Sequence, residues 1–291
     1  MTTPAARHAP DAATKDAPAY THLPLEWGGV DLELLPAGAV HWPAARTLFV
    51  ADTHFGKAAA YRTSGVYVPA GTTDRTLGKL SDLVDATDAA RIVILGDFLH
   101  AKQGRTEPVL DALRAWRNDR PDLELTLVRG NHDDAAGDPP ADLRIDVLDP
   151  GARLDPFTLA HIPAETPDPD AFTLAGHIHA YVILQDADGS MLPMRCFVVR
   201  PTLMILPAFG SFTGGGAYLT QQGDRIVVID GNDFAKEVRV VPRSRAVPES
   251  DRNRFVAAYG DANPDDDDSP SSASPATSES SRSSSPSKRD G

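Results

Sequence analysis

Histidine and acidic residues gather at four places along the chain, each directly after a short apolar run. The four groups are Asp52-Thr53-His54, Gly96-Asp97, Gly130-Asn131-His132-Asp133 and Gly176-His177-Ile178-His179, and His161 stands between the last two. Imidazole, carboxylate and amide oxygens together suit divalent ions such as Mn²⁺, Fe²⁺ or Zn²⁺. More ligands are present than one ion needs, whereas two ions about 3.5–4 Å apart share a bridging carboxylate. The pattern therefore predicts a centre of two divalent metal ions.

The elements that must position these groups alternate between strands and helices. Strands are predicted at the apolar runs 46–51, 91–95, 123–128 and 171–175. Amphipathic helices are predicted over 73–87 and 107–118. After His179 the expected strands follow one another closely, at 181–185, 195–200, 203–206, 225–230 and 237–241. We therefore expect an α/β first half and a mostly antiparallel second half, with the polar groups at the carboxyl ends of the strands.

The order of the motifs from Asp52 to His179 resembles the calcineurin-like metallophosphoesterase superfamily. That resemblance implies an α/β (α+β) fold, a four-layer αββα sandwich with two mixed β-sheets. It implies that Asp52, His54 and His179 bind one metal ion, that Asp97 bridges both ions, and that Asn131, His161 and His177 bind the other. It further implies that His132 protonates the leaving oxygen and that Asp133 holds His132 in orientation.

A narrower resemblance covers about residues 25–243. The strings His41-Trp42-Pro43, Ala51-Asp52-Thr53-His54-Phe55-Gly56-Lys57, Gly96-Asp97-Phe98-Leu99-His100 and Pro207-Ala208-Phe209-Gly210-Ser211-Phe212-Thr213-Gly214-Gly215 are similar to the ligase-associated DNA-damage-response phosphoesterases. The resemblance implies an Mn²⁺-dependent phosphodiesterase or endonuclease that acts on DNA in repair, with an ATP-dependent DNA ligase and a DEXH-type helicase as partners. Thr53 departs from the apolar residue expected there.

Three residues beside the motifs are candidates for substrate contacts. His100 either contacts phosphate or orients the loop that carries Asp97. Lys57 and Arg105 are the best candidates for the local basic rim that a polynucleotide needs, and ordinary solvated charges are the alternative.

Composition excludes several classes of protein. The net charge of −13 over 291 residues excludes a globally basic nucleic-acid binder. The single cysteine, Cys196, excludes a disulfide framework and a cysteine-rich zinc site, and it favours the cytoplasm. No run of 18 apolar residues is present, so no membrane span is expected.

The chain divides into one domain and two extensions. We expect a disordered tail over residues 1–19, a metallophosphoesterase domain over 20–245, and a C-terminal extension over 246–291 that is disordered from about residue 261, where Asp, Ser and Pro predominate.

Two alternative functions stay open. One is a phosphatase or nucleotide phosphodiesterase of the same fold. The other is a non-catalytic binding module built on that fold; such modules typically lose metal ligands, and here none is missing.

Overall fold

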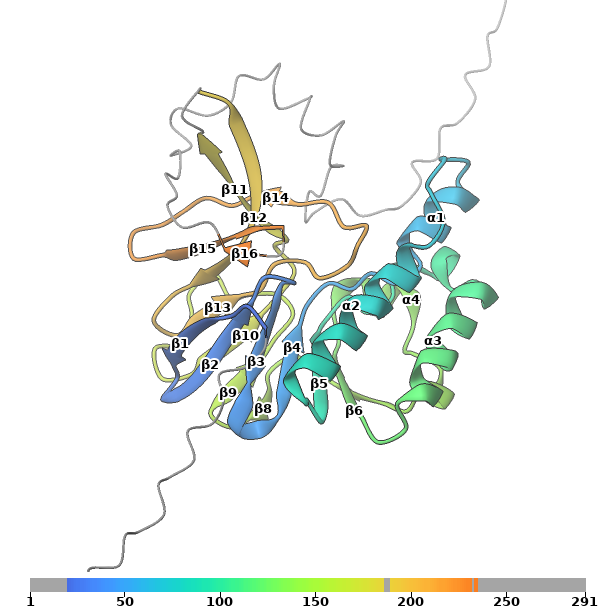
Figure 1. Ribbon diagram of the computed structural model, residues 1–291, viewed down its shortest axis with the longest axis horizontal. Coiled ribbons are helices and arrows are strands. Elements are labelled where there is room, and N and C mark those ends of the chain that lie inside the picture. Colours follow the sequence, from blue (N-terminus) through green and yellow to red (C-terminus); the bar gives the residue numbers. More distant parts are fainter. Residues whose placement is uncertain (1–19, 186–188, 232, 235–291) are drawn as a thin grey trace, which may run out of the picture.

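Two mixed β-sheets pack face to face, and helices α1–α4 lie against one of them (Figure 1). This computed structural model describes residues 20–185, 189–231 and 233–234. The predicted fold class, two mixed sheets with helices, is confirmed. The predicted tails, 1–19 and 246–291, lie outside the described residues, as does the predicted strand 237–241.

The first sheet has seven strands in sequence order, antiparallel from β1 to β4 and parallel from β4 to β7. Strands β4, β5 and β6 correspond to the first three predicted apolar runs, and the other four were not predicted. The strands are β1 Leu23–Trp27, β2 Val30–Leu35, β3 Ala39–Trp42, β4 Thr47–Val50, β5 Arg91–Leu95, β6 Glu124–Val128 and β7 Ile145–Leu148.

The second sheet has nine strands. Seven run in the order β14-β11-β12-β13-β10-β9-β8, while β15 pairs with β12 and β16 with β15. Pairing after His179 is mainly antiparallel as predicted, although β11 and β14 run parallel, as do β10 and β13. The strands are β8 Ala152–Leu154, β9 Phe157–Leu159, β10 Phe172–Ala175, β11 Ala180–Gln185, β12 Met191–Val199, β13 Leu203–Ile205, β14 Gly216–Ala217, β15 Arg225–Asp230 and β16 Asp233–Phe234.

Two longer helices cover the parallel part of the first sheet. Leu77 and Leu80 of α2 and Leu113 of α3 share one core with the sheet, which confirms both predicted amphipathic helices. The helices are α1 Lys57–Thr63, α2 Thr72–Thr87, α3 Glu107–Asp119 and α4 Asn131–Ala136, with 3₁₀ turns η1 Pro43–Ala45, η2 Lys102–Gly104 and η3 Ala141–Leu143. Within the described ranges, no helix has the length and apolar character needed to cross a membrane.

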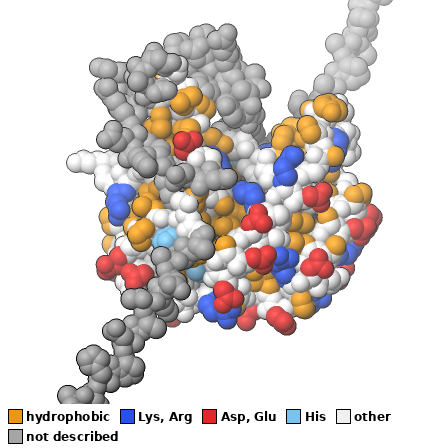
Figure 2. Space-filling model, viewed as in Figure 1, with side chains coloured by type: hydrophobic (Ala, Val, Ile, Leu, Met, Phe, Trp, Pro, Cys, Tyr) orange, Lys and Arg blue, Asp and Glu red, His pale blue; other side chains and the backbone are white. Residues whose placement is uncertain are grey.

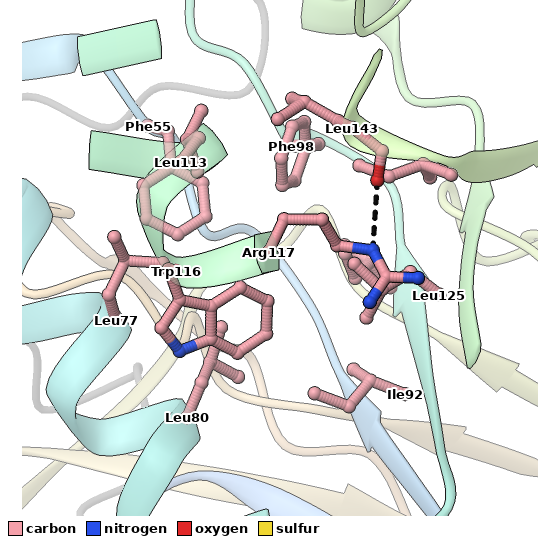
Figure 3. A pocket seen from close by; sticks show the side chains of 12 residues that line it. Phe55, Leu77, Leu80, Ile92, Phe98, Leu113, Trp116, Arg117, Leu125 and Leu143 are labelled. Carbon is pink, nitrogen blue, oxygen red and sulfur yellow. Dashed lines mark hydrogen bonds between the residues drawn. The ribbon is translucent and has the colours of Figure 1, made fainter. Parts of the chain in front are cut away.

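The apolar interior has one layer between the sheets and another between the first sheet and the helices. Phe49, Phe157 and Phe197 are fully buried between the sheets. The helix-side layer encloses a small cavity of about 20 Å³ lined by α2, α3 and β5, where the Arg117 guanidinium donates a hydrogen bond to the carbonyl of Leu143 at 3.0 Å (Figure 3). Its otherwise apolar lining and small size make this cavity part of the core rather than a ligand site.

Candidate metal centre

The carboxyl ends of parallel strands bring the predicted ligands to one edge of the sandwich. Asp52 follows β4, Asp97 follows β5 and Asn131 follows β6, and these three strands are parallel neighbours in the first sheet. His161 and His177 follow β9 and β10, which are parallel neighbours in the second sheet. The centre therefore forms where the same edge of both sheets meets.

Four buried side chains make the first half of the centre. Ligand atoms of Asp52, His54, Asp97 and His179 all lie within 4.8 Å of one another. Nε2 of His179 is 3.1 Å from Nε2 of His54 and 3.4 Å from Oδ1 of Asp52. Nε2 of His54 is 3.5 Å from Oδ2 of Asp97.

The remaining three predicted ligands lie together around His161, which contacts the other oxygen of Asp97. Nε2 of His161 lies 3.0 Å from Oδ1 of Asn131, 3.2 Å from Nδ1 of His177 and 3.2 Å from Oδ1 of Asp97. Nδ1 of His161 donates to the Leu95 carbonyl at 2.9 Å, which turns Nε2 toward the centre. The two oxygens of Asp97 thus face two different groups of ligands, as a bridging carboxylate must.

This donor set fits a pair of divalent cations. Imidazole nitrogens of His54 and His179 face each other at 3.1 Å, and those of His161 and His177 at 3.2 Å. Two such nitrogens attract each other only through a shared proton or cation. With two carboxylates and an amide oxygen, the set suits Mn²⁺, Fe²⁺ or Zn²⁺.

The backbone at the ligands is unusual. Five of the seven ligand residues adopt a left-handed conformation, with φ of 55° at Asp52, 45° at His54, 54° at Asp97, 70° at His177 and 47° at His179. Such φ values are uncommon for residues other than glycine and cluster at functional sites. At these positions the chain departs from the extended path of the preceding strand.

Two motif glycines make room for neighbouring ligands. A Cβ at Gly130 would lie 2.2 Å from Oδ1 of Asp97, and one at Gly96 would lie 2.1 Å from Nδ1 of His161. These glycines are required because a ligand side chain packs directly on the backbone.

Burial and charge set the protonation of the imidazoles. Burial, followed by the charges of His179 and Lys57, holds the pKa of His54 well below its usual range. Burial and then Lys57 lower the pKa of His100 to about 3. Burial also opposes the charged form of His161, but the hydrogen bond to Asp97 and the carboxylates of Asp52 and Asp97 outweigh it and raise that pKa to about 9. Without a metal ion, the proton of this cluster therefore resides on His161.

His132 and His100 lie together at the rim of the centre. Their rings stack with centroids 4.8 Å apart, and the ring of His132 is 5.0 Å from that of His54. The backbone N–H of His132 donates to Asp97 at 3.1 Å, and its ring Nδ1 donates to the His100 carbonyl at 2.8 Å. His100 also places Nδ1 at 3.3 Å from Nδ1 of His54, and His54, His100 and His132 form a second cluster of ligand-type atoms.

Asp133 contacts the backbone of two loops. Its carboxylate accepts hydrogen bonds from the N–H groups of Leu99 at 3.1 Å and Gly130 at 3.0 Å. Burial raises the pKa of Asp133 to about 6, although the two hydrogen bonds lower it. The ring of His132 is oriented by the His100 carbonyl, and Asp133 instead ties the loop after β5 to the start of α4.

The two predicted basic contacts differ in their surroundings. Lys57 begins α1, and its charge contributes to the lowered pKa values of His54 and His100, so it lies close to these two imidazoles. Arg105 donates from Nη1 to the carbonyls of Ala136, Gly137 and Asp138, each at 2.9 Å, and so caps the end of α4.

Two aromatic residues next to the centre were not predicted. The ring of Tyr61 lies 6.4 Å from that of His100 and 6.0 Å from that of Phe212. Tyr61 stands one helical turn after Lys57, so the spacing of these two residues would have placed them on one face had the helix 57–63 been predicted. Phe212 lies in the string 207–215 that carries the narrower resemblance.

Comparison with known proteins identifies the class. The calcineurin-like phosphoesterase family matches residues 45–190, and the chain belongs to that family. It is thus a metal-dependent phosphoesterase. Among solved structures, the nuclease MPE of Pseudomonas putida is 39% identical, over 76% of this chain and 100% of that one, with a TM-score of 0.64. The phosphoesterase Yfce of E. coli is 15% identical, over 67% and 98%, with a TM-score of 0.31. No curated protein matches the sequence.

Proposed function

We propose that this protein is an Mn²⁺-dependent phosphodiesterase that cleaves DNA as an endonuclease. The observation that carries the proposal is Asp97, which has His54 beside one oxygen and His161 beside the other, each within a group of ligand-type side chains. The nuclease of Pseudomonas putida, at 39% identity, supports DNA as the substrate. The motif resemblance supports a role in DNA repair with an ATP-dependent ligase and a helicase, and the buried free thiol of Cys196 agrees with a cytoplasmic location.

The side chains divide the work by position. Two divalent ions would be held around Asp97 by the side chains of Asp52, His54, His177, His179, His161 and Asn131. Bound there, the ions would neutralise charge on the phosphoryl oxygens and favour deprotonation of an attacking water. His132, fixed by the His100 carbonyl at the rim, donates a proton to the leaving oxygen. Lys57 attracts the phosphate from the neighbouring α1.

The test is hydrolysis of a simple phosphodiester and of the matching phosphomonoester by the full-length Mn²⁺-loaded protein, at low and at molar salt. We expect diester cleavage that His132→Ala nearly abolishes, and that His22→Ala, a histidine near the first sheet's edge strand β1, leaves unchanged. Cleavage of the monoester alone would instead identify a phosphatase.

The variant Asp97→Ala separates catalysis from a binding role. We expect it to lose metal and activity together. If the wild type binds two ions and hydrolyses neither compound, and Asp97→Ala retains full cellular function, the protein is a binding module.

A further inference from the structure

Two aromatic side chains, Tyr61 beside His100 and Phe212 beside Tyr61, lie at the outer side of the metal centre. From the metal centre the rings follow one another in the order His54, His100, Tyr61 and Phe212, with centroids 5.2, 6.4 and 6.0 Å apart. Tyr61 and Phe212 meet edge to face at 89°. The pair therefore begins one ring away from His100 and His132, where the leaving group of the reaction must lie.

Phe212 is exposed, and both of its chain neighbours make hydrogen bonds. Its side chain is 36% exposed. On one side, the N–H of Ser211 donates to the hydroxyl of Thr76 at 3.0 Å, and on the other, the hydroxyl of Thr213 donates to the carbonyl of Gly210 at 2.9 Å. An exposed aromatic ring between two hydrogen-bonded neighbours is available for contact with a ligand.

A positive charge and exposed apolar side chains lie on α1 and just after it. Lys57 and Tyr61 are one turn apart on α1, so they share a face of that helix. Val66 and Tyr67, just after α1, are 49% and 90% exposed. In Figure 2, hydrophobic side chains lie at the upper right, where Figure 1 places α1, with Lys and Arg side chains below them. A cation one turn from an aromatic ring matches the phosphate and the base of one nucleotide.

We propose that Tyr61 and Phe212 form a base-binding subsite, in which an unpaired nucleobase of the substrate strand stacks beside the metal centre. This inference rests on the proposed function and deepens it. Aromatic side chains bind bases of any identity by stacking, because every base has a π-face. In a duplex both faces of each base are covered by its neighbours, so the subsite accepts a base only from a single-stranded, looped or frayed segment.

The test compares two single strands that differ only in their bases. One is a short oligothymidylate, and the other has the same backbone with abasic nucleotides. For oligothymidylate we expect Phe212→Leu to raise KM about tenfold with kcat unchanged, the effect of removing one stacking ring. Phe212→Tyr should restore the wild-type KM. On the abasic strand, wild type and Phe212→Leu should have the same KM.

Leu23→Ala is the matched control, because Leu23 is 37% exposed and lies on β1, at the edge of the first sheet away from the metal centre. It should leave both strands unaffected. Tyr61→Leu, a second variant, should raise KM in the same base-dependent way.

Three results would overturn the subsite. They are an unchanged KM in Phe212→Leu, an equal loss on both strands, and a change in oligomeric state that marks Phe212 as an interface between copies. If the wild type cleaves neither strand, the nuclease function fails independently. The subsite is then tested by measuring the binding of both strands by fluorescence anisotropy. If the subsite exists, the wild type binds oligothymidylate more tightly than the abasic strand, and Phe212→Leu binds the two strands equally.

Discussion

The imidazole of His132 donates a hydrogen bond from Nδ1 to the main-chain carbonyl of His100 at 2.8 Å. This contact fixes the tautomer and leaves Nε2 as the ring atom that can act on a substrate. The loop after β5 thus supplies Asp97 to the metal centre and also orients the candidate acid on α4.

His132→Ala should lower kcat for diester hydrolysis by about 10²–10⁴-fold, the usual contribution of a general acid. The loss should be large for an alkoxide leaving group and small for p-nitrophenolate, since a good leaving group needs no proton. Steady-state kinetics on both diesters, with metal content measured in parallel, would check this. Equal losses on the two substrates would argue against proton donation by His132.

Metal binding should release a proton at neutral pH. In the metal-free protein the pKa of His161 is raised to about 9, so the ring is protonated at neutral pH and must lose its proton to bind an ion. Metal affinity should therefore rise as pH increases toward 9. Titration calorimetry in buffers of different ionisation enthalpy measures the proton count directly. An observed enthalpy independent of the buffer would contradict the expectation.

The same pKa shift fixes the pH dependence of the metal-free fold. The pKa of His161 is about 9 in the folded protein, against the ordinary histidine value of 6.5 in the unfolded chain. Because the folded pKa is the higher one, the contribution of His161 to stability is complete below 6.5 and disappears as pH rises through about 9. The loss of stability over this window should be absent in His161→Gln, which denaturant unfolding of both proteins across the pH range would check.

Lys79 should stabilise the segment that supports Asp52. Its ammonium donates to the Phe209 carbonyl at 2.7 Å and lies 4.0 Å from the centroid of the Phe209 ring. The same segment donates from the N–H groups of Phe209 and Gly210 to the carbonyls of Ala51 and Asp52. Burial lowers the pKa of Lys79 to about 7, so the charged form is only partly populated at neutral pH. We expect Lys79→Met to lower the free energy of unfolding by about 1 kcal/mol, the scale of an ordinary hydrogen bond, and to weaken metal binding.

Arg75→Met is the control for Lys79→Met, because Arg75 is exposed on the same helix one turn earlier. Denaturant unfolding and metal titration of both variants would check the prediction. Equal stability of the two variants would mean that the contacts of Lys79 contribute nothing net.

Gly130→Ala should remove metal binding without a change at any ligand. The added Cβ would lie 2.2 Å from Oδ1 and 2.6 Å from the backbone N of Asp97, so the carboxylate of Asp97 must move. Gly78→Ala, on α2 with no atom within 4 Å of its added Cβ, should instead stabilise the protein by about 0.5–1 kcal/mol. Metal content and thermal unfolding distinguish the two variants, and a metal-replete Gly130→Ala would refute the argument.

The sequence was most informative where strands end in polar residues. The strands β4, β5, β6 and β10 were predicted because each is a short apolar run stopped by Gly or Asp. Parallel pairing within the first sheet then brings the ends of β4, β5 and β6 together. The edge strand β7 was missed because only four residues alternate between half-buried and exposed positions, a pattern too short to separate from a loop.

Side-chain partners were harder to predict than positions. Arg105 and Asp133 stand close to the motifs in sequence, yet their partners are backbone groups whose direction depends on how α4 begins and ends. Tyr61 lies on a seven-residue helix, which is too short for periodicity to define a face. Its approach to Phe212 joins residues 151 positions apart and follows only from the packing of α1 beside the loop that carries Phe212.

At the five ligand residues with a left-handed backbone, the substitution that would most stabilise the fold is one that would remove activity. For most residues that conformation costs about 1–2 kcal/mol, and glycine would avoid the cost. Each glycine that relieved the chain at Asp52, His54, Asp97, His177 or His179 would also delete a proposed metal ligand. Laboratory evolution of this enzyme for heat resistance alone should therefore drift toward stable, inactive variants at these five positions, and only a screen for turnover would keep the ancestral residues.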